Sequence, residues 1–64
     1  MEYKINIELI QRQMLKKGYS ITKLAKESNL SKSTVSRLIN QIGTARPETI
    51  YKIATVLDIE DITI

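Results

Sequence analysis

Cysteine, histidine, phenylalanine and tryptophan are all absent from this chain of 64 residues. Without cysteine or histidine, the chain has no disulfides, no thiolate nucleophile, no histidine-based acid–base catalysis and none of the usual zinc sites. No apolar run approaches the roughly 18 residues that a membrane span needs, and nothing resembles a signal peptide. We therefore expect a cytoplasmic protein without a catalytic site, metal, cofactor or small-molecule ligand.

Glycine occurs only twice and proline once, and the sequence has no linker, repeat or low-complexity stretch. Apolar residues make up 42% of the chain, and 11 residues are isoleucine, which is too apolar a composition for a disordered tail. These features predict a single domain over residues 1–64. Because a chain of this size buries only about 60% of its unfolded surface, a second subunit would help to stabilise it.

Acidic residues are scarce in the middle of the chain. Residues 11–46 carry eight basic side chains against Glu27 alone, a net charge of +7, whereas residues 1–10 carry −1 and residues 47–64 carry −3. A basic block of this kind is typical of proteins that bind a polyanion, although a solvated lysine-rich surface would have the same composition.

Apolar spacing and capping residues predict four helices, over about 6–17, 21–28, 32–40 and 47–57. Gly18 marks the end of the first helix, and Pro47 fits the first turn of the last. Ser20 and Ser31 each follow an apolar residue and suit the N-caps of the two middle helices. Between these helices, Asn29 suits the left-handed position of a tight turn.

Two short capped helices joined by a tight turn predict a helix-turn-helix at about residues 20–40, whose second helix enters the DNA major groove. Helical spacing turns Val35, Leu38, Ile39 and Ile42 inward. It turns outward a set of polar side chains without any acid: Lys32, Ser33, Ser36, Arg37 and Asn40. A phosphate-facing surface requires such a set, whereas an ordinary solvated helix usually mixes Glu with Lys.

With the first helix included, residues 7–59 resemble the Cro/phage-repressor (XRE) type of helix-turn-helix DNA-binding family. The resemblance rests on an ordered set of motifs: Leu24-Ala25, Leu30-Ser31, Thr34-Val35-Ser36-Arg37 and Thr49-Ile50…Ile53-Ala54…Leu57. It implies an all-α, lambda-repressor-like bundle of four to five short helices that binds operator DNA as a dimer on an inverted repeat.

The resemblance also implies roles for individual residues. The expected base-contacting residues are Lys32, Ser33, Ser36 and Arg37. The expected phosphate-contacting residues are Ile21 (through its backbone N–H), Lys23, Thr34, Asn40 and Arg46. Arg37 is the principal base reader, because a guanidinium can bond guanine O6 and N7 together. The alternative for each cation is a side chain that stops at the DNA backbone or in solvent.

Three departures from the family pattern stand out. The frequent glutamine at the first position of the second helix is Ile21 here, which removes a side-chain bond to phosphate. The usual turn glycine is Asn29. The positions of a common Arg–Glu bridge between the first and third helices hold Met14 and Ile39, and this joint replacement by apolar groups supports the alignment.

The end of the chain alternates acidic and apolar residues, which is compatible with a last helical turn or an extended segment. We expect Ile59 in the core and Ile62 and Ile64 at a dimer interface within the tail 58–64, the alternative being that the isoleucines fold back on the first helix. Tyr3 and Tyr51 are expected at the half-buried rim of the core.

The sequence thus predicts a DNA-binding transcriptional regulator, most simply a small Cro-like repressor of phage or mobile-element type. Its partners would be double-stranded operator DNA and a second copy of the chain. The alternative is a protein-interaction module with the same fold, antitoxin-like or a modulator of another phage or host regulator, which the loss of glutamine at Ile21 and the apolar tail favour.

Overall fold

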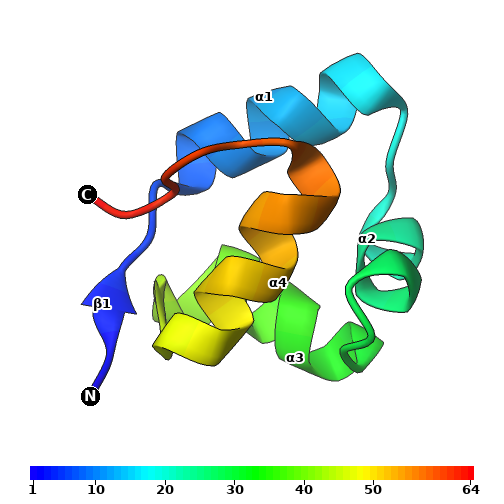
Figure 1. Cartoon of the computed structure of the whole chain (residues 1–64). Coiled ribbons are helices and arrows are strands. Elements are labelled where there is room, and N and C mark those ends of the chain that lie inside the picture. The colour runs from blue at the N-terminus through cyan, green and yellow to red at the C-terminus, as the bar shows by residue number, and fades with distance from the viewer.

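The computed structural model describes all residues, 1–64, and is built mainly from four helices (Figure 1). They are α1 (Ile7–Lys17), α2 (Ile21–Glu27), α3 (Lys32–Arg37) and α4 (Pro47–Leu57). The predicted all-α class is therefore confirmed, and three of the four helices match their predicted ranges to within one residue. The third continues into a π-helical segment, Leu38–Ile42, hereafter the π-turn. None of the helices has the length and apolar character that crossing a membrane requires.

The first helix ends where the sequence predicts. Gly18 adopts a left-handed conformation with φ of 70°, and the N–H of Tyr19 donates to the carbonyl of Met14 at 2.8 Å. Helix α4 ends in the same way at Asp58, with φ of 56° and a 2.9 Å bond from the Ile59 N–H to the Ala54 carbonyl. Both ends thus use the left-handed residue and the backward bond of a Schellman motif, which satisfies carbonyls that a helix end leaves free.

Thirteen buried apolar residues form one core between the helices. Its fully buried side chains come from every helix and from both ends of the chain: Ile5, Ile10, Leu24, Val35, Ile53, Leu57 and Ile62. Met14 and Ile39 are both buried members of this core, as expected for an apolar pair in place of a buried ion pair.

A small antiparallel sheet was not predicted. Strand β1 (Tyr3–Lys4) pairs with β2 (Thr44–Ala45), which lies in the segment 41–46 between the third and fourth predicted helices. The Thr44 hydroxyl also donates to the Glu2 carboxylate at 2.7 Å. The pairing ties the segment that follows the π-turn to the start of the chain.

The C-terminal tail is extended rather than helical and runs back to the start of α1 (Figure 1). The two residues that flank Thr63 form backbone hydrogen bonds with residues near the start of the chain. The Asn6 N–H donates to the Ile62 carbonyl at 2.6 Å, and the Ile64 N–H donates to the Lys4 carbonyl at 3.0 Å. Segment 3–5 therefore lies between β2 and the tail, and the two ends of the chain hold each other.

The expectation that Ile62 lies at a dimer interface is wrong, because its side chain is 0% exposed within the single chain. Fold-back onto the core, the alternative expectation, is the arrangement observed for Ile62. Ile59 packs partly buried against the core, as expected, whereas Ile64 is 83% exposed.

Tyr3 and Tyr51, both expected at the half-buried rim of the core, differ in their exposure. Tyr51 is 71% exposed and Tyr3 is 45% exposed, so the expectation of half-burial is wrong for Tyr51 in particular.

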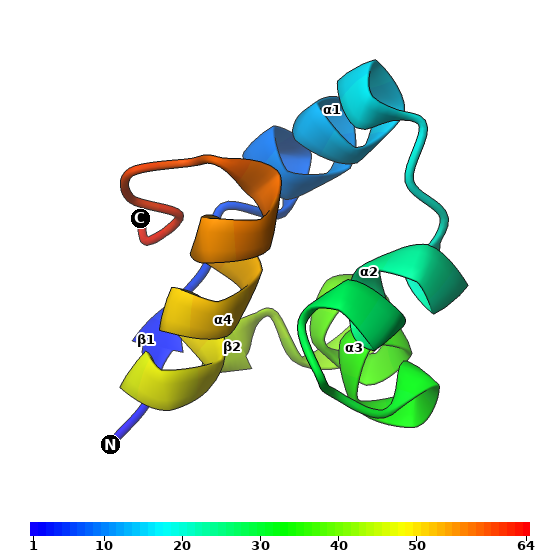
Figure 2. The same cartoon turned by 45° about the vertical axis from the view of Figure 1, so that its right-hand side comes forward.

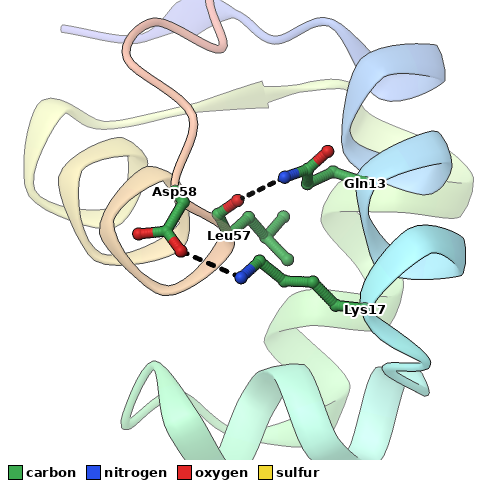
Figure 3. A network of polar contacts seen from close by, with 4 residues as sticks. All are labelled: Gln13, Lys17, Leu57 and Asp58. Atoms are coloured by element: carbon green, nitrogen blue, oxygen red, sulfur yellow. Dashed lines mark hydrogen bonds and ion pairs between the residues drawn. The ribbon is translucent and has the colours of Figure 1, made fainter.

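Helices α1 and α4 are joined by a pair of polar contacts at their C-terminal ends (Figure 3). The Gln13 side-chain amide donates to the Leu57 carbonyl at 2.9 Å, and the Lys17 ammonium lies 2.9 Å from the Asp58 carboxylate. The hydrogen bond to Asp58 raises the pKa of Lys17 above its usual value. A cation and an amide from α1 thus compensate the free carbonyls and carboxylate at the end of α4.

Candidate nucleic-acid interface

Helices α2 and α3 form a helix-turn-helix whose two N-caps are those predicted. The Ser20 hydroxyl accepts from the Lys23 N–H and the Ser31 hydroxyl from the Thr34 N–H, each at 3.1 Å. The apolar residues before the caps, Tyr19 and Leu30, pack partly buried against the core. Each helix therefore starts at a position that both a cap and an apolar contact determine.

The turn between these helices depends on Asn29, which has φ of 59°. The next amide, of Leu30, donates to the Ala25 carbonyl at 2.9 Å, and the Asn29 N–H donates to the Lys26 carbonyl at 3.3 Å. The buried Ser28 hydroxyl donates to the Leu24 carbonyl. The left-handed conformation predicted for Asn29 is confirmed, and these bonds fix the direction in which α3 leaves α2.

Helix α3 presents the four predicted base-contacting positions on its outer side. Lys32, Ser33 and Arg37 are exposed and Ser36 is half-buried, whereas Val35 on the inner side is fully buried. Neither Lys32 nor Arg37 takes part in an ion pair. Both cations are thus free to approach an anionic partner without first breaking an internal contact.

The π-turn changes the end of α3. The Gly43 N–H donates to the Leu38 carbonyl at 2.9 Å, an i to i+5 bond that accommodates one more residue than an α-helical turn. The extra residue rotates the positions that follow, so Ile42, expected on the inner face, is exposed instead. The same turn brings the Asn40 side-chain amide within 3.3 Å of the Ser36 hydroxyl, to which it donates. A predicted phosphate-contacting residue is thereby bonded to a predicted base-contacting residue.

The remaining predicted phosphate-contacting positions differ in how free they are. Arg46 is exposed and unpaired immediately before α4. The Lys23 ammonium lies 3.8 Å from the Glu27 carboxylate and 5.8 Å from the centre of the Tyr19 ring. Thr34 is half-buried, and its hydroxyl accepts from Ser31 at 2.7 Å. Arg46 is therefore the most available of these groups.

Ile21 is the first residue of α2, and its side chain packs partly buried against the core. A side chain in this position does not reach outward, but the N–H groups of a helix's first turn have no partner within the helix. The expected contribution of Ile21 through its backbone is compatible with this geometry.

Sequence reasoning missed Lys26, an exposed and unpaired cation on α2 three positions after Lys23. Its spacing from Lys23 on a short helix was the signal that would have found it. Gln41, which is exposed in the π-turn, was also missed, because no sequence pattern predicts a π-turn.

The charges of the molecule are separated by element. Glu27 is the only acidic residue of α2, α3 and the π-turn, whereas the tail holds Asp58, Glu60 and Asp61. Figure 2 shows α2 and α3 together on one side of α4, with β1 and the C-terminal end on the other. No group of acidic side chains is arranged to hold a metal ion.

This chain is similar to known proteins both in sequence family and in three-dimensional structure. Residues 10–62 match the family model for helix-turn-helix proteins HTH_3. The chain is also similar to the crystal structure of SinR, a master regulator of biofilm formation solved in complex with DNA. The TM-score is 0.78 at 26% sequence identity, over 88% of this chain and 90% of the SinR chain. No curated protein matches the sequence significantly.

Proposed function

This chain belongs to the XRE-type helix-turn-helix family, and we propose that it binds double-stranded DNA sequence-specifically and regulates transcription. One observation carries the proposal: the outer side of α3 holds Lys32, Ser33, Ser36 and Arg37 with no acidic residue and no ion pair among them. A surface of donors and free cations suits base edges and phosphates. The DNA complex of the similar SinR supports the same role.

Helix α3 acts as the recognition helix in the major groove. Arg37 reads guanine, with Lys32, Ser33 and Ser36 contacting neighbouring bases, and Asn40 orients Ser36 through its hydrogen bond. Arg46, Lys23, Thr34, Asn40 and the N–H of Ile21 hold phosphates on either side. Lys23 does so by exchanging its Glu27 partner for a phosphate oxygen.

In the finer form of the proposal, the protein is a Cro-like repressor of phage or mobile-element type that binds an inverted repeat as a homodimer. Recognition helices of a dimer enter successive major grooves about 34 Å apart. The longest dimension of one domain is 30 Å, so two domains side by side are of the right size to span that distance. Of the two residues expected at the dimer interface, Ile64 remains available because it is exposed.

The test is electrophoretic mobility of DNA from upstream of the protein's own gene, beside a shuffled sequence of equal composition, at two salt concentrations. Specific retention that survives the higher salt is the expected result, because base contacts are less salt-sensitive than phosphate contacts. Equal retention of both sequences would contradict sequence-specific binding. No retention at either salt concentration would reject DNA binding and favour the protein-interaction module.

A further inference from the structure

A hollow of about 440 Å³ lies beside α4, and none of its lining residues belongs to α2 or α3. Three parts of the chain form it: Tyr3 from β1, Ile50 and Tyr51 from α4, and Ile59, Glu60 and Asp61 from the tail. Tyr3 and Tyr51 expose large aromatic surfaces beside it. Hollows lined by apolar and aromatic side chains with a few polar groups are where ligands bind preferentially.

The charge around the hollow has one sign. Glu60 and Asp61 lie among its lining residues, and none of those residues is basic. The Asp61 carboxylate is held in place because it accepts from the Thr63 N–H at 2.9 Å and from the Thr63 hydroxyl at 2.6 Å. Glu60 is exposed and has no partner in the chain. Two acidic residues and two tyrosines therefore line the hollow together with the apolar Ile50 and Ile59.

We propose that this hollow is a docking site for a short segment of another protein that carries lysine or arginine beside apolar side chains. The apolar side chains fill the floor formed by Ile50 and Ile59. The cations pair with Glu60 and Asp61 and approach the faces of Tyr3 and Tyr51, where a cation is attracted by the ring.

A second copy of this chain is a poorer occupant. In a symmetric dimer the same patch meets itself, so the carboxylates of Glu60 and Asp61 would face the same carboxylates across the contact. Like charges in that arrangement disfavour association. The proposal does not rest on the proposed function. None of the lining residues belongs to α2, α3 or the π-turn, so a partner bound in the hollow leaves the recognition helix uncovered.

The probe is a short amphipathic peptide of leucine and lysine at helical spacing, compared with the same peptide carrying glutamate for every lysine. Both are titrated into the full chain labelled with ¹⁵N. The lysine peptide is expected to bind at least about tenfold more tightly than the glutamate peptide and to shift the amides of α4, β1 and the tail. Equal binding of the two peptides, or shifts confined to other elements, would overturn the proposal.

Variants test the site itself. Tyr51→Ser and Glu60→Lys are each expected to weaken binding of the lysine peptide by at least about fivefold. The matched controls are Leu15→Ser, which removes another exposed apolar side chain, from α1, and Glu8→Lys, which reverses a charge on α1. Losses in the controls as large as those in the site variants would overturn the proposal.

Sedimentation of the free protein tests whether a second copy of the chain occupies the hollow. The expected result is that Tyr51→Ser leaves both the oligomeric state and the DNA retention of the chain unchanged. A dimer that becomes monomeric on Tyr51→Ser would identify the occupant as a second copy and overturn the proposal.

Discussion

The ammonium of Lys17 and the carboxylate of Asp58 are separated by 41 positions in sequence and by 2.9 Å in space. Asp58 is the left-handed capping residue that directly follows α4, and Lys17 is the last residue of α1. Together with the bond from Gln13 to the Leu57 carbonyl, this pair closes α1 onto the end of α4 (Figure 3).

The Lys17–Asp58 pair predicts that the wild type and Lys17→Met differ in stability by an amount that decreases at alkaline pH. Because the hydrogen bond to Asp58 raises the pKa of Lys17, its contribution to folding is fully present below the unfolded value of 10.5 and is lost as pH rises through the folded value. Thermal unfolding of the wild type and Lys17→Met, compared from about pH 8 to about pH 12, checks this. The two midpoints should converge as pH rises. A difference that is constant over this range would contradict the prediction.

Ile62 should contribute to stability as a core residue. Ile62→Ala is expected to lower the free energy of unfolding by about 2–5 kcal/mol, because it leaves a cavity where the side chain is fully buried. Ile64→Ala, at an exposed position of the same tail, should change it by less than about 0.5 kcal/mol. Urea unfolding measures both values. Should Ile62→Ala fail to fold, Ile62→Val gives a graded test with an expected loss of about 0.5–1.5 kcal/mol. Equal effects at the two positions would contradict the packing described.

Arg37 should determine base preference. Arg37→Ala is expected to cost about 1–3 kcal/mol of binding free energy on operator DNA and to relax the preference at one base pair in each half-site. Binding to a panel of single-base operator variants measures the loss of preference. Lys4→Ala is the control, because it removes an exposed cation from β1, on the other side of α4. Losses of equal size on operator and random DNA would show that Arg37 contacts only phosphate.

Arg46 should act through phosphate. Arg46→Ala is expected to weaken binding to every sequence alike and to reduce the slope of log K against log salt by about 1. Titrations of operator and random DNA over a salt series provide both quantities. A change in base preference without a change in slope would assign Arg46 to base contact instead.

Much of the helix-turn-helix could be predicted because local interactions determine it. Ser20 and Ser31 cap their helices through bonds to residues three positions away, and Asn29 adopts its turn conformation through its own backbone preference. The exposure of Lys32 and Arg37 follows from the burial of Val35 on the same helix. Patterns of this range are contained in a few consecutive residues.

The parts that were missed depend on contacts between distant residues. Two-residue strands such as β1 and β2 have no alternating pattern, and they form because Tyr3 and Ala45 meet across the fold. The burial of Ile62 depends on backbone bonds between the tail and residues 4–6. The exposure of Ile42 follows from the π-turn. The sequence of this segment does not distinguish a π-helical turn from an α-helical one.

The backbone pairing between segment 3–5 and the tail determines when the core can be completed during synthesis on the ribosome. Helix α3 is complete as chain once Arg37 has been added, but the core that it packs against lacks a buried member until Ile62 has emerged. We therefore expect a nascent chain that ends before Ile62 to hold the side chains of the proposed recognition helix on an incomplete core.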